Sequence, residues 1–168
     1  VPGIMHTAFT TVRAIVYAAV FGALWTWVAI TVRPLDARLG IELPRWTAMP
    51  GWLVAAAGLV VVGSCLWVFV EAGRGTPAPF DAPREFVACG PYRLMRNPRY
   101  VGAAAVILGG GMIVGSLSIC LLSAAFLLVA HLFVMTYEEP ALKRQFGASY
   151  DRYRGEVHRW WPRRKPRA

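Results

Sequence analysis

Long apolar runs alternate with short polar segments along the chain. Residues 14–32 and 52–70 contain no charged side chain, and about 20 apolar residues in a helix suffice to cross the hydrocarbon layer of a membrane. Two shorter apolar runs, 100–114 and 119–135, are separated by the turn-like sequence Gly-Ser-Leu-Ser at 115–118. We therefore predict about four transmembrane helices, of which the last two form a tight C-terminal hairpin.

The segments around the first two runs predict how these helices are connected. Residues 33–50 contain three prolines and charges of both signs, so we predict a connecting loop with a short interfacial helix and without candidate chemistry. Gly58 and Gly63 predict close contact with another helix, because glycine lets helix backbones approach. The first run is too long for the core of a signal peptide and is expected to be retained.

The C-terminal tail has the spacing of an amphipathic helix. Its apolar and aromatic positions recur every three or four residues, which predicts a helical face lying along the membrane surface. Gly147 and Ser149 interrupt this pattern, so we expect two short helices, with Ser149 as the N-cap of the second. The positions of the face are Leu142, Phe146, Tyr150, Tyr153 and Val157.

The composition indicates one membrane-embedded domain over residues 1–168, an all-α, polytopic helical bundle. Hydrophobic residues make up 57% of the chain and the mean hydropathy is +0.46, which is too apolar for an ordinary soluble protein. The net charge is +9, but the basic residues cluster beside the apolar runs, so we expect contacts with membrane lipids and none with nucleic acid. Cys65, Cys89 and Cys120 are too far apart to predict a disulfide framework or a metal site.

The distribution of basic residues predicts the orientation. Five arginines lie between residues 73 and 99 and nine basic residues follow residue 136, whereas the turn at 115–118 has none. Cytoplasmic loops of membrane proteins carry an excess of lysine and arginine. We therefore expect a multi-pass protein with both basic segments in the cytoplasm, and we take its membrane to be a bacterial inner membrane. Because residues 33–50 also contain three arginines, a first segment that lies in the membrane plane stays open as an alternative.

Segment 90–102 concentrates hydrogen-bonding side chains beside a membrane boundary. It contains three arginines, two tyrosines and one asparagine, and Pro91 and Pro98 restrict its backbone. A second polar pair, Glu138 and Glu139, closes the apolar block that this segment opens. Because the predicted hairpin returns these glutamates to the arginines, we expect an active site there.

Segment 90–162 resembles a family of small integral-membrane methyltransferases. This family includes isoprenylcysteine carboxyl methyltransferase and, more distantly, the phospholipid N-methyltransferases. Eukaryotic members mostly have Arg-His-Pro where this chain has Arg-Asn-Pro, so an imidazole role is absent, although Asn97 still donates and accepts hydrogen bonds. The shared features are Gly-Pro-Tyr-Arg at 90–93, Arg-x-Pro-x-Tyr-x-Gly at 96–102, the paired glutamates, Phe146-Gly147, Tyr150, Tyr153, Val157, Arg159-Trp160 and Pro162.

The resemblance implies S-adenosylmethionine as cofactor, a lipophilic or prenylated acceptor, and an active site facing the cytoplasm. It implies that residues 90–162 bind the cofactor and that Arg159 and Glu139 are catalytic. Guanidinium groups suit the carboxylate of the cofactor, glutamates suit its ammonium or ribose hydroxyls, and aromatic rings suit its adenine or sulfonium. The residues expected to bind the cofactor are Tyr92, Arg93, Arg96, Asn97, Pro98, Tyr100, Gly102, Glu138, Glu139, Tyr150 and Tyr153.

Several alternatives stay open at this point. Carboxyl O-methylation is slightly favoured over phospholipid-type N-methylation, because a carboxylate acceptor arrives ionised and needs no base. An NADPH-dependent sterol-type reductase and a non-enzymatic membrane protein are the other possibilities. Gly109 and Gly111 resemble a Gly-x-Gly tied to cofactor binding but are expected to serve helix packing. His131 is either functional or a neutral, hydrogen-bonded residue.

Overall fold

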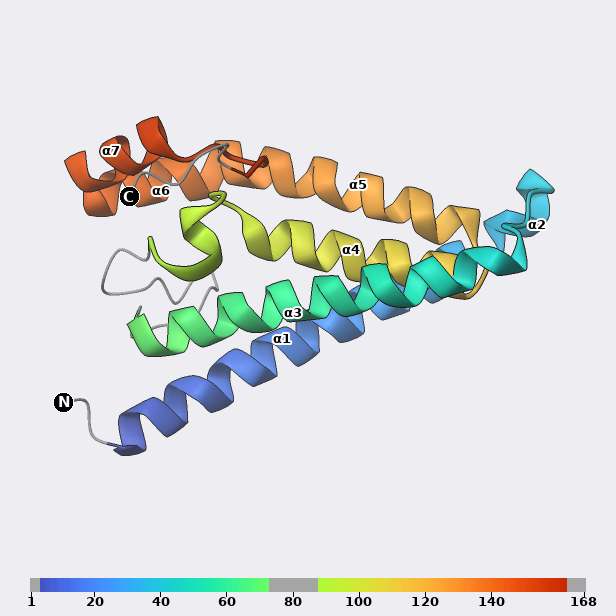
Figure 1. Ribbon diagram of the computed structural model, residues 1–168, viewed down its shortest axis with the longest axis horizontal. Coiled ribbons are helices and arrows are strands. Elements are labelled where there is room, and N and C mark those ends of the chain that lie inside the picture. The colour runs from blue at the N-terminus through green and yellow to red at the C-terminus, as the bar shows by residue number, and fades with distance from the viewer. Residues whose placement is uncertain (1–3, 73–87, 163–168) are drawn as a thin grey trace. The chain divides into compact units, whose positions relative to one another are not determined.

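The computed structural model describes residues 4–72 and 88–162, and this part of the chain is helical, as predicted. Each of the four apolar runs falls largely on one helix. These helices are α1 Ile4–Val32, α3 Ala48–Ala72, α4 Pro98–Ile113 and α5 Leu117–Phe133, in the order of the runs. A 3₁₀ turn precedes α3 at Arg45–Thr47, another precedes α4 at Gly90–Arg93, and a π-helical turn follows α5 at Val134–Glu138. The other helices of this part of the chain are α2 Leu35–Leu39, α6 Glu139–Phe146 and α7 Ala148–Glu156 (Figure 1).

Within residues 4–72 and 88–162, three helical stretches are long and apolar enough to cross a membrane. They are Thr11–Arg38, Arg45–Val68 and Leu117–Phe146. The fourth apolar helix, α4, is shorter, with 16 residues. Large apolar side chains such as Trp27 are exposed on these helices, as expected where lipid tails cover the outer surface.

The chain divides into two compact units. The first unit combines the described parts of Val1–Ala19, Gly63–Pro98 and Leu132–Ala168, and the second combines Val20–Val62 with Arg99–His131. The paired glutamates and the polar segment belong to the first unit, with the exception of residues 99–102.

Glycines bring α3 and α4 into close contact within the second unit. A Cβ atom on Gly58 would lie 2.6 Å from the carbonyl oxygen of Gly102, and one on Gly109 would lie 2.6 Å from that of Gly51. These glycines therefore permit the close approach of the two helices. The packing prediction is confirmed for Gly58 but wrong for Gly63, because no described atom lies within 4 Å of a Cβ atom placed there.

Helices α4 and α5 form a hairpin, as predicted. The Ser123 hydroxyl on α5 donates a 2.8 Å hydrogen bond to the carbonyl oxygen of Ala104 on α4. Near the turn, a Cβ atom on Gly111 would lie 2.8 Å from Cys120. The chain reverses at Gly115, whose φ of 69° lies in the left-handed region that favours glycine.

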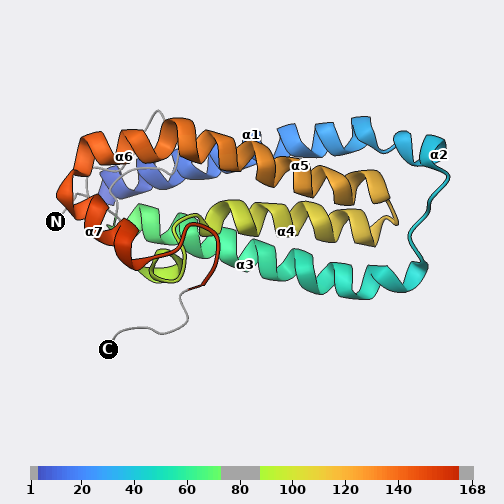
Figure 2. The ribbon, with the colours of Figure 1, turned by 90° about the horizontal axis from the view of Figure 1, so that it is seen from above.

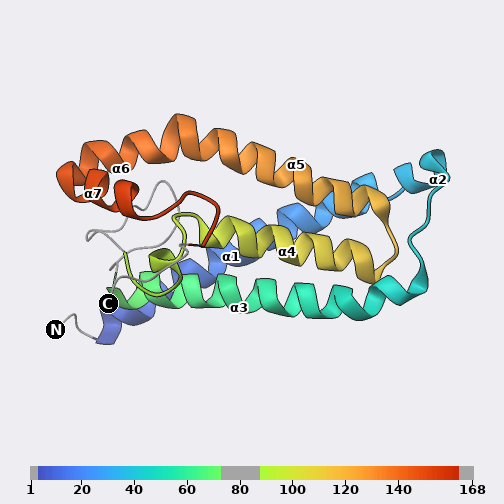
Figure 3. The same ribbon diagram turned by 45° about the horizontal axis from the view of Figure 1, so that its top comes forward.

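The loop between α2 and α3 is tied to this hairpin turn (Figure 3). Asp36 on α2 accepts a 2.5 Å hydrogen bond from the Ser116 hydroxyl and a 2.8 Å bond from the backbone N–H of Ser118. It thereby satisfies donors at the start of α5 that have no partner within the helix. Leu43 N donates to the carbonyl oxygen of Gly115 at 3.1 Å. The predicted connecting loop with its short helix is thus an integral part of the second unit.

Helix α5 continues through the π-helical turn into α6, so that one helical stretch runs from Leu117 to Phe146 (Figure 1). Pro140 is the second residue of α6 and has no N–H for the carbonyl group four residues earlier. The wider π-helical turn directly before α6 accommodates this missing bond without ending the helix. It also shifts the direction of the side chains that follow.

The tail breaks at Gly147, as predicted. Gly147 has φ 51° and ψ −125°, a conformation that is costly for any residue with a side chain. The prediction of Ser149 as N-cap is wrong, because Ser149 lies inside α7 and Gly147 is the N-cap. The expected face is accordingly divided, with Tyr150 buried in α7 and Val157 buried beyond its end.

Candidate active site

The polar segment before α4 is held in place at both ends. Gly90 begins the 3₁₀ turn with a φ of 55°, and a Cβ atom there would lie 2.7 Å from the side chain of Val68 on α3. Pro98 begins α4 and is fully buried, at a helix position that tolerates the missing N–H of proline. Arg96 and Asn97 therefore lie in a short segment with little conformational freedom.

The tail after α7 is fixed against this segment (Figure 2). Buried Asn97 is part of this contact. Its side-chain amide donates a hydrogen bond to the backbone carbonyl group of Arg159. This bond keeps Arg159 next to the polar segment. The bonds are Tyr153 Oη to the Tyr92 carbonyl oxygen at 2.6 Å, Arg96 N to the His158 carbonyl oxygen at 2.9 Å, and Asn97 Nδ2 to the Arg159 carbonyl oxygen at 3.3 Å.

Glu139 lies between two arginines. Arg159 binds both of its carboxylate oxygens, with Nε 2.7 Å from Oε1 and Nη2 2.9 Å from Oε2, which is the strong bidentate geometry. Arg96 Nη1 lies 3.0 Å from the same Oε1. The side chains of Arg96 and Glu139 are only 11% and 12% exposed. The sequence prediction that arginines meet a returning glutamate is thus confirmed.

Tyr150 completes this group, and we call Arg96, Glu139, Tyr150 and Arg159 the Glu139 cluster. The Tyr150 hydroxyl accepts a 3.4 Å hydrogen bond from Arg96 Nη1, and the ring is buried. Burial, followed by the charge of Glu139, raises the pKa of Tyr150, and burial raises that of Tyr153. The hydrogen bond to Glu139 raises the pKa of Arg159. At neutral pH the tyrosines are therefore neutral and the arginine is charged.

The Glu139 cluster has an excess of positive charge, since two guanidinium groups share one carboxylate. The Nε atom of Arg96 is buried and has no hydrogen-bond partner among the described residues. A buried donor without a partner is energetically costly. An anionic group such as the carboxylate of a cofactor would compensate both the charge and the donor.

Other predicted site residues are placed differently. Arg93 is exposed and forms no ion pair within the described part of the chain. Glu138 is partly exposed and close enough to Tyr150 for its charge to raise the pKa of that hydroxyl. Tyr100 belongs to the second unit, where the guanidinium carbon of Arg99 lies 4.6 Å from its ring centroid.

Gly102 and the Gly-x-Gly sequence also lie in the second unit. Gly102 and Gly109 pack against α3, and Gly111 packs against the start of α5. Helix packing is sufficient to explain glycine at these three positions, as expected for Gly109 and Gly111. A cofactor contact of Gly102 stays a prediction.

Three features of the site were not predicted from the sequence. The hydrogen bond from the Asn97 amide group to the backbone of Arg159 was not expected, and a cofactor contact of Asn97 stays a prediction. The π-helical turn, which ends directly before Glu139, has no simple signal apart from Pro140. The hydrogen-bonding contribution of His158 is made by its backbone carbonyl, which no side-chain motif reveals.

Comparison with known families supports the methyltransferase assignment. The family model described as phospholipid methyltransferase matches residues 46–149, more than half of the chain. No curated protein matches the chain. The match covers α3, α4, α5, α6 and Glu139, but ends before Tyr150 and Arg159. With its long apolar helices, the chain belongs to the phospholipid methyltransferase family and is a multi-pass membrane enzyme that uses S-adenosylmethionine.

Proposed function

We propose that this enzyme transfers the methyl group of S-adenosylmethionine to the carboxylate of a lipophilic, lipid-like or prenylated acceptor. The cofactor supplies an activated methyl group on a sulfonium. The work of the protein is then to bind and orient both reactants and to exclude water. The single observation that carries the choice of acceptor is the state of Glu139, whose two carboxylate oxygens are both bound by arginine.

An amine acceptor must lose a proton before it can attack, whereas a carboxylate is already ionised at neutral pH. In the Glu139 cluster, Glu139 is engaged by Arg96 and Arg159, and Tyr150 is protonated because its pKa is raised. No member of the cluster is therefore arranged as a proton acceptor. Its excess positive charge is suited to orienting an anionic acceptor or the cofactor carboxylate.

The cofactor roles follow from the same arrangement. We assign the cofactor carboxylate to Arg96, because the unpartnered Nε atom belongs to this residue, and methyl-acceptor orientation to Arg159 with Glu139. Glu138, which is partly exposed, is assigned to the ammonium or ribose hydroxyls. Tyr150 has no exposed ring face, so its hydroxyl positions Arg96. The remaining proposed contacts are Tyr92, Arg93, Asn97, Pro98, Tyr100, Gly102 and Tyr153.

Phospholipid N-methylation is the second candidate, and the family match favours it. The two reactions are distinguished by incubating membranes that contain the enzyme with S-adenosylmethionine carrying a tritiated methyl group. A carboxyl methyl ester releases volatile labelled methanol on treatment with alkali, whereas an N-methyl group stays bound to the non-volatile headgroup. Label that stays non-volatile after alkali would overturn carboxyl methylation, and loss of label in Glu139→Gln would show that the product depends on the cluster.

We also propose that α4 is the fourth, short span and that the Glu139 cluster faces the cytoplasm. The basic residues near the cluster support this orientation. It predicts that Cys89, which is exposed, and a cysteine introduced at Ala148 react with a membrane-impermeant thiol reagent from the cytoplasmic side. A cysteine at Ser116 would react from the opposite side or remain shielded. Labelling of Cys89 and position 148 from opposite faces would exclude this topology.

A further inference from the structure

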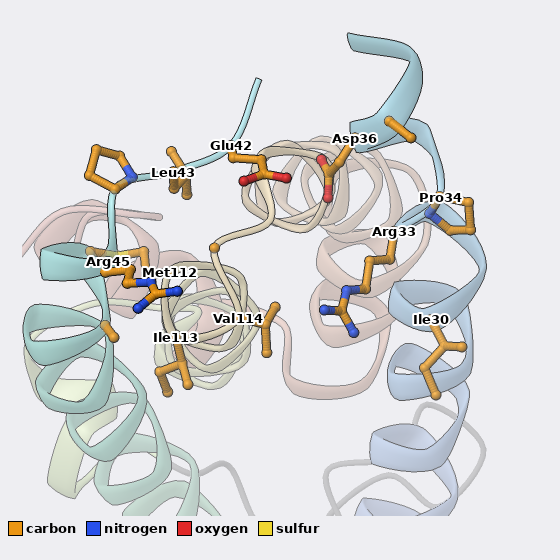
Figure 4. A pocket seen from close by; sticks show the side chains of 14 residues that line it. Ile30, Arg33, Pro34, Asp36, Glu42, Leu43, Arg45, Met112, Ile113 and Val114 are labelled. Atoms are coloured by element: carbon orange, nitrogen blue, oxygen red, sulfur yellow. The ribbon is translucent and has the colours of Figure 1, made fainter. Parts of the chain in front are cut away.

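A pocket outside the Glu139 cluster lies in the second unit, beside the end of α1 and the start of α3 (Figure 4). Its volume is about 820 Å³, which is in the range of small-molecule sites. Four charged side chains from the segment between α1 and α3 line it, namely Arg33, Asp36, Glu42 and Arg45. None of them is expected to bind the cofactor.

Hydrogen bonds between its walls keep this pocket formed. The Thr47 hydroxyl shares its one proton between the carbonyl oxygens of Pro44 at 2.8 Å and Met112 at 3.1 Å. Leu43 N donates to the carbonyl oxygen of Gly115 at 3.1 Å. These bonds join the loop before α3 to the end of α4. A preformed pocket loses less conformational entropy when a ligand binds.

The charges in the pocket are only partly neutralised by the protein. Figure 4 shows Arg33 and Arg45 reaching into the pocket from opposite sides, with Asp36 and Glu42 along one edge. Asp36 is bound by serine residues at the start of α5. The charge of Arg33 acts on nearby Asp36, but within the described part of the chain Arg33, Arg45 and Glu42 form no side-chain ion pair or hydrogen bond. Two cations and one anion are therefore available to a ligand.

The position of these charges points to a lipid. Arg33 directly follows α1, and Arg45 begins the 3₁₀ turn that leads into α3. Both residues therefore lie at the ends of helical stretches that are long enough to span a membrane. Polar headgroups and hydrocarbon meet at such positions. Apolar side chains of Ile30, Ile113 and Val114 line the same pocket. Figure 4 shows them at the part of the pocket that lies away from Asp36 and Glu42. The pocket thus combines a polar edge with an apolar wall.

We propose that this pocket binds a resident phospholipid. Arg33 and Arg45 hold the phosphodiester group from two sides, because guanidinium groups donate hydrogen bonds to phosphate oxygens. Glu42 binds an ammonium group in the headgroup, which gives preference to a zwitterionic lipid. The acyl chains lie along Ile30 and Ile113. This lipid is distinct from the methyl acceptor, since the pocket contains no residue of the Glu139 cluster.

Native mass spectrometry of the full chain in detergent tests this proposal, with palmitoyl-oleoyl phosphatidylethanolamine as the probe. We expect Arg33→Gln combined with Arg45→Gln to weaken lipid binding at least about tenfold, because two charge-assisted hydrogen-bonding groups are lost. Arg38→Gln is the matched control, because it removes the same charge from α2 outside the pocket lining. Wild-type lipid occupancy in the double variant would overturn the proposal.

The headgroup assignment is tested with three further probes. Glu42→Gln should weaken binding of the phosphatidylethanolamine while leaving palmitoyl-oleoyl phosphatidylglycerol unchanged. Palmitoyl-oleoyl glycerol, which lacks the phosphate, should bind weakly, and glycerophosphoethanolamine, which lacks the chains, should not displace the lipid. Equal binding of palmitoyl-oleoyl glycerol would refute phosphate recognition. The single variants Arg33→Gln and Arg45→Gln, each with a partial loss, keep the test valid if the double variant folds poorly. Methyl transfer is not the readout, so this test is independent of the proposed reaction.

Discussion

The Glu139 cluster and the pocket beside α1 and α3 both contain two arginines and one or more acidic side chains, but these are mostly buried and paired in the cluster and largely exposed in the pocket. In the cluster, Arg96 and Arg159 bind one carboxylate, and the Arg96 and Glu139 side chains are nearly buried. In the pocket, Arg33 and Arg45 are exposed. Interactions between charges strengthen where water is excluded, and exposed charges are screened. The cluster is therefore expected to support both stability and function, whereas the pocket arginines are expected to support ligand binding alone.

The largest effect is expected from Glu139→Gln. This change leaves two arginines without their shared carboxylate, so we expect a loss of about 3 kcal/mol in the free energy of unfolding together with loss of cofactor binding. Unfolding in detergent and calorimetric titration with S-adenosylmethionine measure the two effects.

Asp151→Asn is the matched control for Glu139→Gln. Asp151 lies 3.6 Å from Lys143, but these side chains are 48% and 58% exposed. We expect a change below about 0.5 kcal/mol in the free energy of unfolding, because exposed ion pairs contribute little. Equal destabilisation by the two substitutions would remove the contrast between buried and exposed charges.

Lysine substitutions compare the two arginines of the cluster. Arg159→Lys keeps the charge but loses the bidentate contact with Glu139, so we expect methyl transfer to fall by about tenfold or more. Arg96→Lys should have a smaller effect, because Arg96 approaches Glu139 through one nitrogen. Initial rates with tritiated cofactor measure both. A greater loss of methyl-transfer rate in Arg96→Lys than in Arg159→Lys would show that Arg96 contributes more to the reaction than Arg159.

A smaller effect is expected at Asn97, which supports Arg159 through its amide N–H groups. Asn97→Asp removes this donor, and we expect a loss of about 1–2 kcal/mol in the free energy of unfolding with a lower methyl-transfer rate. Asn97→His restores a ring N–H donor and should recover most of the rate. Full activity of Asn97→Asp would show that the buried amide does not position the arginine.

The smallest effect on stability is expected in the pocket. In lipid-depleted micelles, Arg33→Gln combined with Arg45→Gln should change the free energy of unfolding by less than about 0.5 kcal/mol, as for other exposed positions. Urea unfolding followed by tryptophan fluorescence measures this change. A loss above 1 kcal/mol would mean that these arginines stabilise the fold itself, and the comparison between the two clusters would no longer hold.

The apolar runs predicted the helices well, because hydrophobic length directly reflects the thickness of the membrane. The meeting of Glu139 with Arg96 was also predictable, since a hairpin must return its second leg to the level of the first. The burial of Tyr150 and the support of Arg159 by Asn97 were not predictable, because they depend on how the tail folds back after Gly147. The pocket was missed because its charged residues have no periodic spacing and come together only through the hydrogen bonds of the connecting loop.

The π-helical turn Val134–Glu138 has a consequence for how such enzymes can change. One residue advances an α-helix by about 100° around its axis. Deleting a single residue within this turn would therefore rotate the Glu139 carboxylate out of line with its arginines, while the hydrocarbon-crossing part of α5 would keep its length. The number of residues in this turn therefore sets the direction in which the Glu139 carboxylate points around the helix axis. The length of the membrane-crossing helix and the direction of this carboxylate can thus evolve separately.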